Sequence, residues 1–152
     1  MPITSNFSPD KFRRQIDAKI ASRKAALIVR LQVVGEECLN QARSGHLYLN
    51  QTGNLCSSIG YCITDNGNIV GQGKWQAIQG QTGNGSEGKE AGMQYLQEVA
   101  SREEGKEGIT FIMVAGMPYA KYVEAMSLDV LDTSEQMAER KIREMLDKIF
   151  KK

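Results

Sequence analysis

The residues of this chain that could do chemistry are few, and each has a simpler structural interpretation. Among its 152 residues are one histidine, His46, and three cysteines, Cys38, Cys56 and Cys62. A structural zinc site takes four ligands at characteristic spacings, and these cysteines form no CxxC pair. A cysteine nucleophile needs a base and a group that orients the base, which a single histidine without a motif does not supply. We therefore expect no catalytic residue, no metal site, and reduced, buried thiols.

A glycine-rich segment carries the one pattern that suggests a cofactor. Residues 83–89 read Gly-Asn-Gly-Ser-Glu-Gly-Lys, which matches the GxxxxGK part of a phosphate-binding loop. Glu90 follows where Ser or Thr would hold magnesium, and no buried parallel strand precedes the segment to aim it. We expect a loop that leads into a helix, and no cofactor. A nucleotide or small-ligand module that uses residues 80–89 is the alternative.

Charge is concentrated only near the N-terminus. The net charge is +1, so the chain as a whole is not drawn to nucleic acid or to an anionic membrane. No apolar run approaches the roughly 20 residues of a bilayer span, and we expect no membrane partner. Basic side chains on an amphipathic helix are usually solvated, but contact with phosphates makes DNA binding a second alternative. The basic residues in question are Lys11, Arg13, Arg14, Lys19, Arg23, Lys24 and Arg30.

Two segments are expected to be flexible. Prolines at positions 2 and 9 disfavour a helix and predict a flexible arm over residues 1–9. Residues 76–88 are rich in Gly, Gln, Asn and Ser, which predicts a mobile loop. The remainder is long enough for one hydrophobic core, so residues 10–152 are predicted to form one domain.

A long helix should open this domain. Apolar residues recur between Phe12 and Ala42 at steps of three, four or seven, which predicts one amphipathic helix. Asp10 is the expected N-cap, and Gly45 is expected to end the helix after Ser44. Gly35 is the expected position of a kink or a break.

A β-hairpin is predicted next. Residues 58–64 alternate large and small side chains, which predicts a strand whose small face packs closely on another element, with the long helix as a candidate. Residues 65–68 read Asp-Asn-Gly-Asn, the signal for a type I′ turn. The return strand, over 68–75, contains two glycines and is expected to be an edge strand or a projecting arm. The large residues are Ile59, Tyr61 and Ile63.

The C-terminal half is predicted to alternate helices and strands. The expected elements are a helix over 87–104, a strand over 109–115, a short helix opened by Pro118, an extended piece over 128–131 and a final helix. The strand is apolar on both faces and should be central. The final helix should begin at a capping box formed by Thr133 and Gln136. Expected buried residues of these helices are Met93, Leu96, Val99, Ala100, Met137, Ile142, Met145, Leu146, Ile149 and Phe150.

This order of elements predicts the α+β class. We expect a small mixed, mainly antiparallel sheet with a β-hairpin, packed against the long N-terminal helix and the C-terminal helix.

Two short segments, far apart in the sequence, each join a strand to a helical turn. The first contains Thr52, Gly53, Leu55, Ser58 and Ile59. The second contains Pro118, Tyr119, Ala120, Val123 and Glu124. In the first, the threonine hydroxyl or Asn54 can cap one turn, which two apolar residues four apart would fix to the core. In the second, proline fixes the helix entry, Ala120 permits close approach, and Tyr119, Tyr122, Val123 and Met126 can pack around one side. Glu124 is expected to lie as a charge beside that apolar patch.

In combination and order, these segments resemble the tail-component family of long-tailed bacteriophages, small neck proteins that help join a DNA-filled head to its tail. Family members typically show a long N-terminal helix, a TG-x-L-x-x-S-I segment entering a hairpin and a P-Y-A-x-x-V-E segment after a central strand. The resemblance covers roughly residues 27–124. The family pattern usually continues into a Gly-rich turn, whereas residues 125–127 here read Ala-Met-Ser.

The resemblance implies a structural virion protein, not an enzyme. It would assemble, as a ring of its own copies, at the head–tail junction of particles built in the bacterial cytoplasm. Its other partners would be further neck and tail proteins, and it would have no small-molecule substrate. The candidate interface residues in the hairpin, the loop and the short helix are Trp75, Ile78, Gly83, Asn84 and Tyr122.

Overall fold

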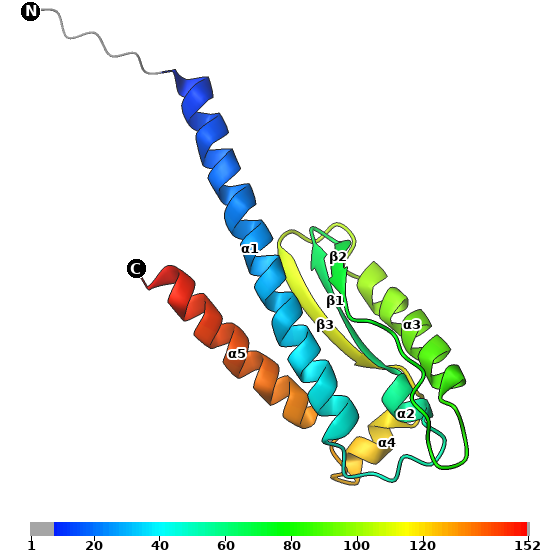
Figure 1. Ribbon diagram of the computed structural model, residues 1–152. Coiled ribbons are helices and arrows are strands. Elements are labelled where there is room, and N and C mark those ends of the chain that lie inside the picture. The colour runs from blue at the N-terminus through cyan, green and yellow to red at the C-terminus, as the bar shows by residue number, and fades with distance from the viewer. Residues whose placement is uncertain (1–7, 152) are drawn as a thin grey trace, which may run out of the picture.

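Three antiparallel strands with helices on both faces form an α+β fold in residues 8–151, the part of the chain that the computed structural model describes (Figure 1). The strands are β1 (Ile59–Asp65), β2 (Asn68–Gln72) and β3 (Ile109–Ala115), in the order β2-β1-β3. The helices are α1 (Pro9–Ser44), α2 (Asn54–Ser57), α3 (Ser86–Ser101), α4 (Ala120–Ala125) and α5 (Asp132–Phe150). The predicted class is confirmed, with a sheet that is antiparallel rather than mixed.

The long helix begins earlier than the sequence suggested. Pro9 is the first residue of α1, and the Ser8 hydroxyl accepts a hydrogen bond from the Lys11 amide (3.4 Å). Ser8 is thus the N-cap, and Asp10 lies within the first turn. Proline suits this position because the first amides of a helix have no intrahelical acceptor. Of the arm predicted over residues 1–9, residues 1–7 lie outside the described part of the chain.

Gly35 allows α1 to pack closely on the sheet. The break expected there is absent, because α1 continues through this residue as one helix of 36 residues. A Cβ atom on Gly35 would overlap the ring of Tyr61, which is 1% exposed on β1. The Tyr61 hydroxyl then donates to the Gln32 carbonyl (3.1 Å) and to Glu36 Oε1 (2.8 Å). The missing side chain therefore brings helix and strand together.

The β-hairpin forms as predicted, but its small face has a different neighbour. Asn66 and Gly67 both have positive φ (49° and 83°), as a type I′ turn requires. The large face of β1 packs on α1 in the main core. The small face receives α3 and the ring of Trp75, which a Cβ atom on Gly60 or Gly92 would overlap. The close neighbour of that face is therefore α3, not the long helix.

The predicted central position of β3 is wrong. In the described part of the chain β3 pairs only with β1, so it is one edge of the sheet and β2 is the other. Ile112 and Val114 are buried on the face that packs on α3, whereas Phe111 and Met113, on the face towards α1 and α5, are only half-buried.

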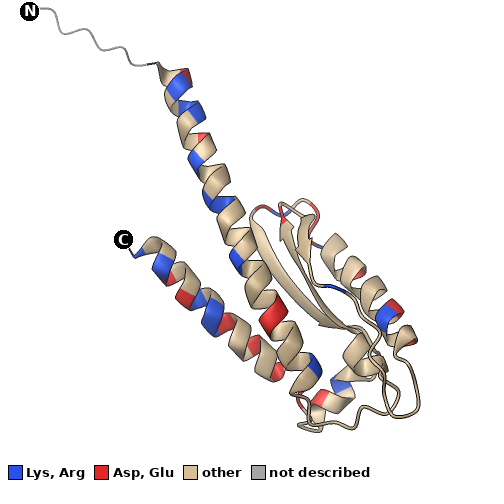
Figure 2. Cartoon of the chain, in the orientation of Figure 1, with Lys and Arg blue, Asp and Glu red and all other residues tan. Residues whose placement is uncertain are grey.

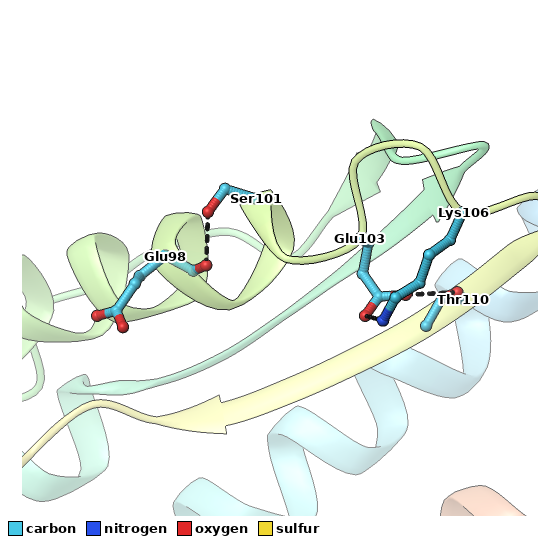
Figure 3. A network of polar contacts seen from close by, with 5 residues as sticks. All are labelled: Glu98, Ser101, Glu103, Lys106 and Thr110. Carbon is cyan, nitrogen blue, oxygen red and sulfur yellow. Dashed lines mark hydrogen bonds and ion pairs between the residues drawn. The ribbon is translucent and has the colours of Figure 1, made fainter.

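The connection from α3 to β3 is held by local polar contacts. In Figure 3, Lys106 Nζ lies 2.7 Å from Glu103 Oε1, and the Thr110 hydroxyl donates to the other oxygen of that carboxylate (3.4 Å). The hairpin turn joins the same connection, since Asn66 Oδ1 accepts from the Gly108 amide (2.8 Å). These contacts fix the start of β3 beside the hairpin.

Several C-terminal predictions are corrected. Residues 128–131 form no strand, and Asp129 has a positive φ of 46°. Helix α5 begins after Leu131, so Thr133 lies inside it and forms no capping box. Met93 and Phe150 are exposed (42% and 74%) rather than buried.

Candidate interaction surface

The first segment, residues 52–59, forms a tight turn that enters β1. Gly53 has a positive φ of 79° immediately before α2, a conformation that favours glycine. Thr52 Oγ1 accepts a hydrogen bond from the Asn54 amide (3.3 Å), but the residue at the N-cap of α2 is Gly53, not Thr52 or Asn54. Leu55 and Ile59 are buried in the main core, as predicted.

The Gly-rich loop is hydrogen-bonded to this turn. The Ile78 amide donates to Ser57 Oγ (2.7 Å), and the Gly85 amide donates to the Thr52 carbonyl (3.2 Å). A Cβ atom on Gly53 would overlap the Ile78 carbonyl, so the turn and the loop fit only because position 53 is glycine. Mobility of residues 76–88 stays a prediction, but these contacts make the loop part of the scaffold around α2.

The start of α3 offers no open phosphate cradle. Asn54 Oδ1 accepts from the Gly88 amide (3.2 Å), and its Nδ2 donates to Glu87 Oε2 (3.1 Å). The Lys89 amide donates to the Gly85 carbonyl (3.0 Å). A phosphate-binding loop must present free amides to its ligand, and these amides already have acceptors in the chain.

The second segment, residues 118–124, holds the start of α5. Ala120 is buried, and Val123 packs on the main core. The Glu124 carboxylate accepts hydrogen bonds from the amides of Val130, Leu131 (3.2 Å) and Asp132 (2.8 Å). These amides lie at the α5 N-terminus, where they have no acceptor within the helix. Glu124 is therefore a helix cap supplied from another element.

The apolar side chains of α4 that were expected to pack are largely exposed. Tyr122 is 73% exposed and Met126 62%. The preceding loop lies close by, since the Leu47 amide donates to the Leu128 carbonyl (3.4 Å). We call the exposed apolar residues of this region the α4 patch: Leu47, Leu49, Tyr119, Tyr122 and Met126. The patch lies at the end of the molecule opposite the start of α1 (Figure 1).

A second apolar surface lies on the N-terminal half of α1. Leu31 and Val34 of α1 are buried against the body. Ile16 and Ile20 lie on the same helix face as these residues. Each residue of the series Ile16, Ile20, Leu27, Leu31 and Val34 follows the one before it by three, four or seven positions. Ile16 is nevertheless 40% exposed and Ile20 59%. Figure 1 shows the reason: this half of α1 projects beyond the sheet and the other helices.

The projecting half of α1 is also basic. Figure 2 shows Lys and Arg along its turns and few acidic residues. Lys24, close to the body, pairs with Asp65 across 2.6 Å. Arg13 and Lys19 lie three residues before and after Ile16, so they flank the apolar residues on the helix surface. The arm thus combines an apolar centre with a basic border.

A groove of about 760 Å³ runs between β3 and α5. We call it the β3–α5 groove, and it is lined by Phe111, Met113, Leu131, Glu135, Ala138, Glu139, Ile142, Arg143, Leu146 and Asp147. Its floor is apolar and its rim mainly acidic. Glu135 and Glu139 are exposed and have no ion-pair partner within residues 8–151. A second groove, between α3 and α4, shares Met113 and Leu131 with it, so the two grooves meet at β3.

The predicted interface residues divide into two groups. Trp75 and Ile78 are half-buried and pack on the cores of their own chain. A Cβ atom on Gly83 would overlap the Thr52 carbonyl, so Gly83 serves a close internal contact. Asn84 and Tyr122 are exposed. The stripe on α1 and the β3–α5 groove were missed as interface candidates, although the apolar spacing from Phe12 onward already contained the stripe.

The cysteines, considered above as nucleophiles and metal ligands, lie inside the protein. The three cysteines are buried and form no disulfide. Burial raises the pKa of each thiol, that of Cys62 to about 11, so that all stay protonated near neutral pH. Within residues 8–151 no cluster of His, Cys, Asp and Glu side chains could hold a metal ion. In the same residues no helix is both long and apolar enough to cross a membrane.

Comparison with known proteins gives no match. No protein-family model, no curated protein and no solved structure matches this chain.

Proposed function

We propose that the chain is a structural subunit of the neck of a long-tailed bacteriophage, of the tail-completion type. Copies of the chain assemble as a ring at the head–tail junction of virions built in the bacterial cytoplasm. The observation that carries this proposal is the apolar stripe of α1, which continues out of the folded body through Ile16 and Ile20. An apolar surface of this kind, bordered by polar residues, is typical of a protein–protein contact.

The two family segments support the assignment to phage necks. Each segment is a joint of the fold: residues 52–59 lead into β1, and residues 118–124 follow β3 and cap α5. Ser127 and Asp129 have positive φ (57° and 46°) in the turn that follows. Glycine is the residue that adopts such angles most readily, which agrees with the Gly-rich turn of the family pattern at this place.

A structural role also agrees with the chemistry of the chain. The thiols are held protonated, and the Gly88 and Lys89 amides at the end of the GxxxxGK segment already have acceptors. We therefore propose a protein without enzymatic activity or cofactor. The α4 patch, at the opposite end from the α1 arm, provides a surface for a further neck or tail protein.

DNA is the competing partner of the basic α1 arm. Contact with phosphates would need its lysines and arginines but not its isoleucines. Binding of the chain to DNA fragments that weakens steeply with salt, and that is unchanged by Ile20→Glu, would favour this alternative.

The test of the proposed function is genetic. Deletion of the gene from the phage genome that carries it should yield filled heads and separate tails in electron micrographs of the lysate. Addition of the purified chain should restore complete particles. The neighbouring genes should encode portal, major capsid and tail-tube proteins. Normal particle formation after the deletion would refute the proposal.

A further inference from the structure

We propose that the projecting half of α1, residues 9–24, of one copy binds in the β3–α5 groove of the next copy. This inference rests on the proposed function, because it names the contact through which the copies would join. Donor and acceptor are different surfaces of one chain, so each copy both gives an arm and receives one. Such a head-to-tail contact builds a ring when the rotation between copies closes.

The apolar parts of the two surfaces fit each other. The arm offers Ile16 and Ile20, spaced by one helical turn and exposed. The floor of the groove offers Phe111, Met113 and Ile142. An amphipathic helix that places residues spaced in this way into an apolar groove is a common mode of recognition.

The charged parts are complementary as well. Arg13 and Lys19 flank the isoleucines of the arm, while Glu135 and Glu139 form part of the groove rim without an ion-pair partner among the described residues. Complementary charges of this kind select a partner and fix its register more than they add affinity. They also argue against pairing of two arms, because that contact would bring the basic residues of both helices together.

The free edge of β3 gives an independent reason for a cover at this place. Residues 109–115 contain no charge and no proline, and in the described part of the chain only one side of β3 is paired. An exposed apolar edge strand invites unwanted pairing, and natural proteins protect such edges with a helix or a loop. The arm of a neighbouring copy would supply that helix, since the groove runs along β3.

Sedimentation velocity across a concentration series tests the contact in the full chain. Ile20→Glu should raise the dissociation constant for self-association at least about 10-fold, because it places a charge in an apolar contact. Val29→Glu is the matched control, since Val29 is equally exposed (59%) on the opposite face of the same helix. It should leave the dissociation constant unchanged.

A charge exchange tests the acceptor side. Glu135→Lys with Glu139→Lys should weaken self-association at least about 5-fold, and the further changes Arg13→Glu and Lys19→Glu should restore it. Carbodiimide cross-linking of a mixture of ¹⁴N- and ¹⁵N-labelled chains should join Lys19 of one copy to Glu135 or Glu139 of another. Self-association that the groove variants leave unchanged would overturn the inference, as would a chain that stays monomeric at its highest soluble concentration.

The outcomes separate this inference from the proposed function. If particle formation requires the gene but substitutions in the β3–α5 groove leave self-association unchanged, the inference alone is refuted. Self-association that follows the predicted pattern, together with normal particles after gene deletion, would refute the proposed function alone. Salt-sensitive binding of the arm to DNA without self-association would overturn the inference in favour of a nucleic-acid partner.

Discussion

Replacement of Glu124 is the sharpest test of how the fold is held together. In Glu124→Ala the amides of Val130, Leu131 and Asp132 lose their shared acceptor. Loss of a helix cap costs about 0.5–2 kcal/mol, and a hydrogen bond to a charged group contributes about 1.5–3 kcal/mol. Because the carboxylate is only partly buried, we expect the lower part of the combined range, about 2 kcal/mol, which in a domain of this size lowers Tm by roughly 4–8 °C.

Thermal unfolding followed by far-UV circular dichroism measures this effect. Glu124→Gln keeps one acceptor oxygen and should lower Tm by about half as much as Glu124→Ala. Glu135→Ala is the control, since this first-turn residue of α5 accepts no backbone hydrogen bond and should cost less than about 1 kcal/mol. Hydrogen exchange of the amides at residues 130–132 should quicken in Glu124→Ala. A Tm within about 1 °C of the wild-type value would refute the capping role.

Four further substitutions test three separate features. The Glu124 carboxyl raises the pKa of Asp132 through a hydrogen bond and like charge, so the folded state binds that proton more tightly. This contribution to stability is present at pH values below the usual aspartate pKa and is lost as the pH rises through the raised pKa of Asp132. The Tm of the wild type minus that of Asp132→Asn should therefore fall as the pH rises through that pKa. A Tm difference that does not change with pH would contradict this prediction. Gly35→Ala should lower the urea midpoint, by about 1–3 kcal/mol in stability, because the new methyl group overlaps an aromatic ring; an unchanged midpoint would show that the helix and strand can separate freely. Ser127→Gly should raise stability by about 1 kcal/mol by relieving a positive φ. Asp129→Gly should not, because Asp129 Oδ1 also accepts from the Thr133 amide (2.9 Å), and equal gains in both variants would refute that distinction.

Local patterns in the sequence predicted local structure well. Asn66-Gly67 gave the correct turn because both residues tolerate the positive φ that it needs. The apolar spacing in residues 12–42 gave the correct long helix, since helical periodicity is a property of neighbouring turns. The bounds of β3 were also predicted correctly, from a short apolar run between polar residues.

Features that depend on distant parts of the chain were not predictable in this way. The apolar character of β3 suggested a central strand, but β3 is an edge strand with one face buried under α3 and the other face only half-buried beside α1 and α5. The capping role of Glu124 depends on a turn that brings α4 beside the start of α5. Likewise, Thr133 and Gln136 have the spacing of a capping box, yet α5 begins before them, at Asp132. The acceptor for the Asp132 amide is the Glu124 carboxylate of α4.

The candidate interface also combines local features that the sequence predicts with features that depend on the folded chain. The stripe on α1 was visible as periodicity, but its exposure depends on where the body of the molecule ends. Trp75, at the end of the predicted edge strand, was a candidate interface residue, whereas its ring lies against two glycines of its own chain. The sequence alone does not show whether an aromatic residue is exposed or buried, because burial depends on its neighbours in the folded chain.

A cryo-electron microscopy reconstruction of the head–tail junction in purified particles would show whether this chain is a neck subunit. We expect a closed ring of copies of this chain between head and tail, with each α1 arm lying in the groove of the adjacent copy. A junction built entirely from other proteins, with no peptide of this chain detectable in the particles by mass spectrometry, would contradict it.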